Sequence, residues 1–169
     1  MSSAPLADAS VMVIDVGGIN SVGGFADPLN VTLQQYIAPG AYITGIDFDV
    51  VLSAYGTSWL SEFMVDCSES TYTTGAYISP GWGTDAPGLN VPYSGGFDLT
   101  TSDLDFYLGS DGILLLTFRE ASDDPGVNPD GLWVSGTLSI TYTVPEASSV
   151  FLAMSGCGIA LFRRRRSRG

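Results

Sequence analysis

The sequence predicts an all-β protein: an antiparallel β-sandwich of the jelly-roll type, followed by a single C-terminal transmembrane helix. Three observations lead to this prediction. Apolar and polar residues alternate along short segments of the first 143 residues, which is the pattern of half-buried strands. Turn-forming residues, among them many of the 21 glycines and 9 prolines, separate these segments. Near the C-terminus, an uncharged apolar stretch ends at a cluster of arginines.

Strands are expected wherever the alternation has a period of two. Such segments are residues 10–16, 46–52, 63–67, 103–108 and 134–144. Residues 113–118 form an unbroken apolar run, which is typical of a central strand covered on both faces. About eight or nine short strands with turns between them favour a sandwich, which we place at residues 10–143. Residues 79–96, which include Ser94-Gly95-Gly96, are expected to be irregular and to contain turns.

Charge is distributed unevenly along the chain. Residues 1–143 hold 17 of the 18 acidic residues and a single basic residue, Arg119, so their net charge is −16. The remaining residues carry +4, which gives −12 for the whole chain. A body this acidic repels nucleic acid and anionic lipid, so no nucleic acid partner is expected. The acidity is typical of solubility outside the cell, and Arg119 is expected to pair with a nearby carboxylate.

The composition argues against an enzyme. The chain has no His and no Lys, which excludes Ser-His-Asp and Cys-His nucleophiles, His-ligated zinc and Schiff-base chemistry. The pairs Asp47/Asp49 and Asp103/Asp105 could place carboxylates roughly 7 Å apart on one strand face, a separation that some glycosidases use. Any solvent-facing strand produces such pairs, so we expect no catalytic residues.

One loop combines several potential metal ligands. Asp123, Asp124, Asn128 and Asp130 lie among glycines and prolines just before Trp133. Their oxygens are candidate ligands for Ca²⁺, which takes six to eight oxygen ligands. The spacing does not match an EF-hand, and an ordinary polar turn loop is the alternative. Ca²⁺ is therefore the one cofactor that the sequence suggests.

The aromatic residues suggest a second kind of site. The 3 Trp and 8 Tyr can stack on sugar rings or fill the core of a sandwich. We expect Trp59 and Trp133 in the core, whereas Trp82, in the irregular segment, is the candidate ligand-binding residue. With the acidic loop, Trp82 supports an alternative function for the body, a Ca²⁺-dependent carbohydrate-binding module acting on exopolysaccharide.

Residues 1–9 are predicted to be the remnant of a signal peptide c-region. Ala7-Asp8-Ala9 has the small-x-small form that precedes a signal cleavage site, and the first strand-like segment follows directly. A chance match in a loop is the alternative. On the first interpretation, translation starts upstream of Met1 and the apolar half of the leader is encoded there.

The last residues have the composition of a membrane anchor. Residues 147–162 are 16 consecutive uncharged residues, somewhat short of the ~20 that cross a bilayer as a helix. Arginine stems that reach the headgroups can complete the span. A buried core helix is the alternative, but it has no reason to stop at the arginine cluster 163–168. Within this cluster, four consecutive residues orient the body outside by the positive-inside rule; they are Arg163, Arg164, Arg165 and Arg166.

Val144, Pro145, Glu146 and Ala147 precede the apolar segment. In this order, the motif at 145–147, the apolar segment and the arginine cluster resemble the PEP-CTERM sorting signal. The family's motif reads Pro-Glu-Pro, where this chain has Pro-Glu-Ala. The resemblance covers residues 144–169 only. The body, through residues 43–62 and 131–138, also resembles the jelly-roll surface domains of other proteins with such tails.

The resemblance implies how the protein is exported and sorted, and it implies no catalytic activity. A leader takes the chain through the inner membrane of a bacterium, and the tail anchors it there transiently with the body outside. Exosortase, a multi-pass membrane enzyme, then acts near Pro145 and Glu146, and the body passes to the cell surface or the extracellular matrix, often in bacteria that make exopolysaccharide. The expected function is that of a non-catalytic surface or matrix protein whose partners are exosortase, the inner membrane and possible exopolysaccharide ligands.

Overall fold

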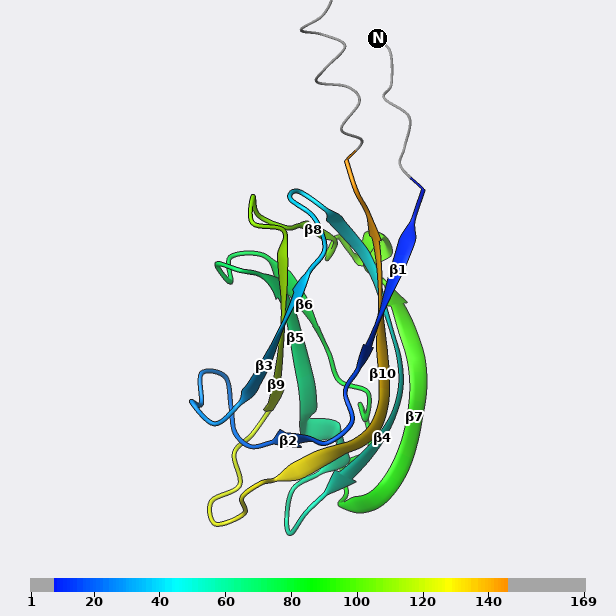
Figure 1. Ribbon diagram of the computed structural model, residues 1–169. Helices are drawn as coiled ribbons and strands as arrows, with labels where there is room; N and C mark the ends of the chain where they lie inside the picture. The colour runs from blue at the N-terminus through cyan, green and yellow to red at the C-terminus, as the bar shows by residue number, and fades with distance from the viewer. Residues whose placement is uncertain (1–7, 146–169) are drawn as a thin grey trace, which may run out of the picture.

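The computed structural model describes residues 8–145, which form two antiparallel sheets packed face to face (Figure 1). The predicted all-β, antiparallel sandwich is thus confirmed. Within residues 8–145 the only helical turns are two short 3₁₀ segments, η1 (Leu60–Glu62) and η2 (Leu99–Ser102). Both lie in connections between strands, where they turn the chain without adding a layer.

The two sheets contain ten strands in all. The first sheet has the order β1 (Ser10–Asp15), β10 (Gly131–Thr143), β4 (Tyr42–Ala54) and β7 (Gly88–Asp98), with β2 (Ile19–Ser21) beside β10 and β8 (Phe106–Tyr107) beside β4. The second sheet has the order β3 (Val31–Tyr36), β9 (Ile113–Glu120), β5 (Phe63–Glu69) and β6 (Gly75–Ile78). Every pairing is antiparallel.

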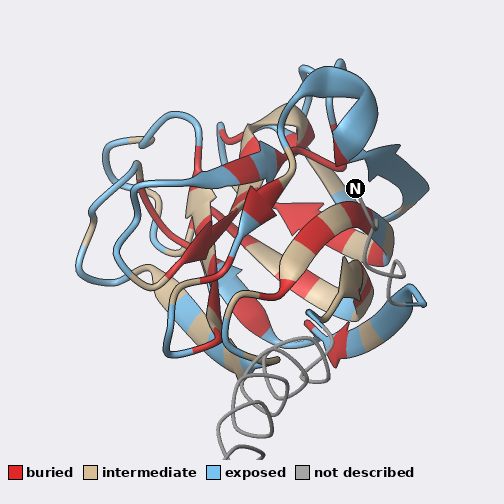
Figure 2. Cartoon of the chain, turned by 90° about the horizontal axis from the view of Figure 1, so that it is seen from above, coloured by how far each residue is buried: buried red, intermediate tan, exposed pale blue. Residues whose placement is uncertain are grey.

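The core lies between the sheets, and the connecting loops are mostly exposed (Figure 2). The predicted alternation of β4 is confirmed, because Ile46, Val50 and Leu52 are buried while Asp47 and Asp49 are exposed. Period-two alternation places successive side chains on opposite faces of a strand. In β5 and β9 the same rule sends alternate apolar side chains to the same core.

The predicted alternation of β10 is correct in its second half and wrong in its first. Leu138 and Ile140 are buried as expected, but at the start of the strand Trp133 is buried and Val134 is only half-buried. The register against β4 shifts between Trp133 and Ser135. A bulge adds one residue to the strand, so the face that points inward changes from odd to even positions.

Two other segments differ from the prediction. Residues 88–96 belong to β7, not to a loop, and Ser94-Gly95-Gly96 lies inside that strand. Conversely, the expected strand at 103–108 shortens to Phe106–Tyr107, and Leu104 is exposed. β7 is the edge of its sheet and none of its residues is fully buried. The alternation of Leu89, Val91 and Tyr93 is short, and the proline and glycines among and after these residues are depleted in strands, so they indicate turns instead.

The described residues end at the start of the predicted tail. Val144 and Pro145 follow directly after β10. Residues 1–7 and Glu146, Ala147, the apolar segment and the arginine cluster lie outside the described residues. Within 8–145, no helix is long and apolar enough to cross a membrane.

Candidate functional site

A cleft opens between the two sheets at one side of the sandwich. It lies where β6 and β7, the edge strands of the two sheets, face each other, and its volume is about 550 Å³. We call it the aromatic cleft, since its exposed lining includes Tyr77 of β6, Trp82, Phe97 of β7 and Leu104. The predicted ligand-binding residue Trp82 is therefore brought together with two further aromatic side chains.

The local sequence holds Trp82 out into solvent. Pro80 and Gly81 are buried, and a Cβ on Gly81 would collide with the Leu60 carbonyl oxygen of η1. The Trp82 N–H donates to the Ser79 carbonyl at 3.2 Å, and the Ser79 hydroxyl donates to the Ser61 carbonyl at 2.9 Å. Trp82 is 85% exposed on this anchored turn, so a ligand would not have to order the turn to contact its indole.

The exposed aromatic side chains of the cleft indicate a contact surface. Single apolar residues are often exposed, but neighbouring large ones mark a contact surface. Tyr77 is 62% exposed beside Trp82. Flat aromatic faces in a cleft offer stacking surfaces to apolar or ring-shaped ligands. Trp59, expected in the core, is 44% exposed, whereas Trp133 is buried as expected.

The structure divides the four residues of the predicted metal loop. Asp123 and Asn128 are exposed, and Asp124 is half-buried with Oδ2 shielded from solvent. Asp130 is fully buried. Among residues 8–145, no three Asp, Glu or Cys side chains already converge as a formed metal site. Instead, Asp130 lies near a residue that the sequence analysis did not select, Glu120.

The strand ends explain why these two acids meet. Glu120 is the last residue of β9 and pairs with Phe63 in one sheet. Asp130 directly precedes Gly131, which pairs with Ser21 and Ala54 in the other sheet. The loop of residues 121–130 joins the two positions across the end of the sandwich. We call Ser21, Glu120, Asp124 and Asp130 the buried acid cluster.

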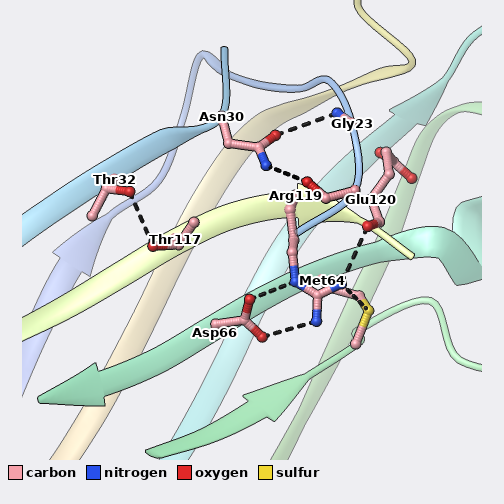
Figure 3. Close-up of polar contacts among 9 residues, drawn as sticks. Gly23, Asn30, Thr32, Met64, Asp66, Thr117, Arg119 and Glu120 are labelled. Atoms are coloured by element: carbon pink, nitrogen blue, oxygen red, sulfur yellow. Dashed lines mark hydrogen bonds and ion pairs between the residues drawn. The ribbon is translucent and has the colours of Figure 1, made fainter. Parts of the chain in front are cut away.

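Backbone hydrogen bonds hold the cluster in place. The Glu120 N–H donates to the Gly23 carbonyl at 2.8 Å, and the Asp130 carbonyl accepts from the Tyr55 N–H at 2.8 Å. Asn30 braces the same turn: the Gly23 N–H donates to Asn30 Oδ1 at 3.3 Å, and the Asn30 side-chain amide donates to the Gly24 carbonyl at 2.8 Å (Figure 3). The main chain around both acids is thus fixed by bonds that do not involve their carboxylates.

Neither buried carboxylate has a hydrogen-bond partner. Glu120 and Asp130 are both 0% exposed, and all four of their carboxylate oxygens are unpartnered. Burial raises the pKa of Glu120 to about 8; the nearby Ser21 hydroxyl partly offsets this, although its geometry falls short of a hydrogen bond, and the Asp130 carboxylate adds to it. Burial likewise raises the pKa of Asp130 to about 6; the nearby Asp124 N–H partly offsets this, although its geometry also falls short of a hydrogen bond.

Arg119 does not neutralise the cluster. Consecutive residues on a strand face opposite sides, and the guanidinium lies on the outer side, where it pairs with Asp66 (Nη2 to Oδ1, 3.0 Å). This pairing confirms the expected partnership with a carboxylate. Figure 3 shows the guanidinium over Asp66 and Met64, with only the main-chain carbonyl of Glu120 in contact. No other basic side chain belongs to the part of the chain that the structure describes.

A signal for Glu120 was present in the sequence. The face of β9 that points into the core consists of Leu114, Leu116 and Phe118. Glu120 lies two residues after Phe118, so its side chain points to the same face and is also buried. An acid at the end of an inward-facing series is the pattern of a buried charge. The unbroken apolar run ends at Phe118, and an interpretation based on this run alone does not reach Glu120.

Comparisons with known proteins add little. No family model matches this chain, and no curated protein does. Solved structures with some likeness include the VP2 subviral particle of infectious bursal disease virus, with 14% identity over 83% of this chain and a TM-score of 0.39. Another is tomato aspermy virus, with 15% identity over 88% of this chain and 85% of that one and a TM-score of 0.34. The chain spans 34% of the VP2 chain, and at these TM-scores neither likeness bears on its function.

Proposed function

We propose that the protein is an exported cell-surface or matrix protein, sorted and processed by exosortase, whose body is a non-catalytic jelly-roll scaffold. The observation that carries the proposal is the order of motif, apolar segment and arginine cluster in residues 144–169. The fold supports it, because β10 ends at Thr143, immediately before the motif. Six of the nine connections between successive strands cross from one sheet to the other, which supports the jelly-roll assignment.

Replacement of Arg163, Arg164, Arg165 and Arg166 by Ser is expected to prevent correct sorting. Without these charges nothing retains the tail on the cytoplasmic side, so the chain would no longer present its motif to the enzyme. Fractionation and immunoblotting of cells with and without exosortase would locate the protein and show whether its tail is removed. The matched control replaces the same residues by Lys, which keeps the charge. An unchanged location and size of the Ser variant would contradict the proposal.

A second candidate function, binding of exopolysaccharide, is favoured by the aromatic cleft. Trp82 and Tyr77 offer exposed ring faces, and Phe97 lies across the cleft from β6. The charge of −16 over residues 1–143 disfavours polyanions. A neutral or weakly charged glycan is therefore the ligand class that we propose for this cleft.

Trp82→Ala is expected to weaken binding of the host's exopolysaccharide by at least ~10-fold, because anchoring Trp side chains commonly contribute about 2 kcal/mol or more. Affinity electrophoresis and calorimetry would measure the change, with and without Ca²⁺. Trp59→Ala is the matched control, since Trp59 is also exposed but is not part of the cleft lining. Equal affinities of the Trp82 and Trp59 variants would remove the cleft as the binding site.

A further inference from the structure

We infer that the buried acid cluster is a Ca²⁺ site, with the carboxylates of Glu120 and Asp130 as its central ligands and Asp124 and Ser21 as further ligands. The site differs from the one expected from the loop sequence, because Glu120 and Ser21 come from strands and Asp123 and Asn128 are left exposed. The inference rests neither on exosortase sorting nor on glycan binding.

Unsatisfied oxygens carry this inference. Six side-chain oxygens of the cluster are shielded from solvent and have no hydrogen-bond partner: Ser21 Oγ, both oxygens of Glu120, Asp124 Oδ2 and both oxygens of Asp130. Buried polar groups are almost always paired in native proteins, and buried charges require a partner. Six oxygens also meet the lower limit of Ca²⁺ coordination. A cation between Glu120 and Asp130, with Asp124 and Ser21 turned towards it, would give these oxygens a partner.

Two other ways to compensate for the buried carboxylates of Glu120 and Asp130 are weaker than a metal ion. Arg119, their only basic side chain, is engaged with Asp66 on the outer face of its sheet. A proton shared between Glu120 and Asp130 would remove one charge, but it would satisfy at most two of the oxygens. Removal of two like-charged carboxylates from water is costly unless something compensates for it. A divalent ion offers that compensation.

The type of ligand favours Ca²⁺ over other metals. The cluster offers only oxygens, from carboxylates and a hydroxyl, whereas structural zinc sites in proteins are built from Cys and His. The ligands come from β2, the end of β9 and the loop before β10, which suits the flexible geometry that Ca²⁺ accepts. Mg²⁺ demands a near-ideal octahedron and keeps several waters, so it fits an enclosed, irregular cluster less well.

The ion would connect the two sheets. Ser21 belongs to the first sheet and Glu120 to the second. Asp124 is only half-buried on its loop, so we expect it to move inward as the third carboxylate when the ion binds. This movement also accounts for the absence, among residues 8–145, of three acids already arranged as a metal site.

The test begins with the unaltered full-length chain in mild detergent, stripped of metal by EDTA. Titration with CaCl₂ in the calorimeter is expected to give a dissociation constant of about 10⁻⁴ to 10⁻³ M, the range of extracellular Ca²⁺ modules. At a 100-fold excess of Ca²⁺ over that constant, the melting temperature should rise by roughly 5–10 °C. MgCl₂ at the same concentration should produce a much smaller shift. Neither heat nor a thermal shift with CaCl₂ would overturn the inference.

Variants then locate the ion. Glu120→Gln keeps the size and polarity of the side chain but removes a central carboxylate, so it is expected to lose the Ca²⁺ response while its melting temperature in EDTA changes little. A shared proton would instead give no Ca²⁺ response in the unaltered chain. If the Gln variant does not fold, Asp124→Asn serves instead and should weaken Ca²⁺ binding by at least ~10-fold, in line with the loss of a charged ligand. Its matched control is Asp123→Asn, adjacent but exposed, which should change the affinity less than about threefold. Equal losses in the Asp123 and Asp124 variants would overturn the assignment of the ligands.

Discussion

Gly136→Ala is expected to destabilise the sandwich by about 3–5 kcal/mol, a large fraction of the roughly 5–15 kcal/mol by which ordinary domains are stable. Gly136 lies in β10 with a φ of +123°, opposite Val50 of β4. Residues with a side chain rarely adopt this backbone conformation, which costs of order 1–3 kcal/mol by itself. An added Cβ would also meet the Asp49 carbonyl oxygen and lie 2.5 Å from the Val50 Cα. Both obstacles are main-chain atoms of a central strand, so neither can move aside easily.

Two control variants separate these effects in urea unfolding experiments. Gly18 also has a positive φ, of +80°, but a Cβ there would meet nothing within 4 Å, so Gly18→Ala should cost only the backbone term of about 1–2 kcal/mol. Gly24 has no positive φ and equally open surroundings, so Gly24→Ala should be close to neutral. A loss for Gly136→Ala no larger than that for Gly18→Ala would show that the contact with β4 is absent.

The bulge near Gly136 also shows what the sequence can and cannot predict. Alternation identified β10 and placed Leu138 and Ile140 in the core, because a period of two is a local property. A bulge inserts one residue between two correctly patterned halves, and nothing local distinguishes Trp133 from Val134 as the inward residue. Which residues before the bulge point inward is therefore decided by the pairing of β10 with β4, and local sequence does not predict it.

β7 illustrates a second limit. Its residues include Pro92, Gly95 and Gly96, which are depleted in strands, and none of its side chains is buried. What makes it a strand is the row of backbone partners that β4 supplies, from Gly45 to Ala54. The alternation of Leu89, Val91 and Tyr93 is too short to reveal such a strand by itself, because the strand depends on its neighbour.

The candidate sites follow the same logic. Trp82 could be selected from its sequence because a tryptophan in an irregular, Gly- and Pro-containing segment has few core positions open to it. The companions of Trp82 in the cleft, Tyr77 and Phe97, come from the edges of two different sheets, and only the topology brings them together. In the acid cluster, likewise, the loop sequence indicated Asp124 and Asp130, whereas Glu120 and Ser21 required knowledge of which strand ends meet.

Trp133→Ala is expected to destabilise the protein by about 3–5 kcal/mol, the range observed when a large buried aromatic side chain is removed. Trp133 is 0% exposed at the centre of the core. Its ring makes edge contacts with Phe118, at 5.1 Å between centroids, and with Phe63, at 6.0 Å. These two rings belong to the second sheet and Trp133 to the first, so the substitution would open a cavity at the contact between the sheets. Thermal unfolding followed by circular dichroism should show a melting temperature lower by roughly 10 °C.

Two further substitutions test whether burial is the cause. Trp59→Ala removes an identical side chain from an exposed position and should cost less than about 1 kcal/mol, as is usual for surface substitutions. Trp133→Phe keeps an aromatic ring while removing an indole N–H that has no hydrogen-bond partner, so it should recover a large part of the loss. Because that N–H is buried without a partner, its removal does not cost a hydrogen bond. The remaining loss of stability then comes from the smaller volume of the Phe ring. Similar losses for Trp59→Ala and Trp133→Ala would contradict the position of Trp133 in the core, and with it the register shift that turns this residue inward.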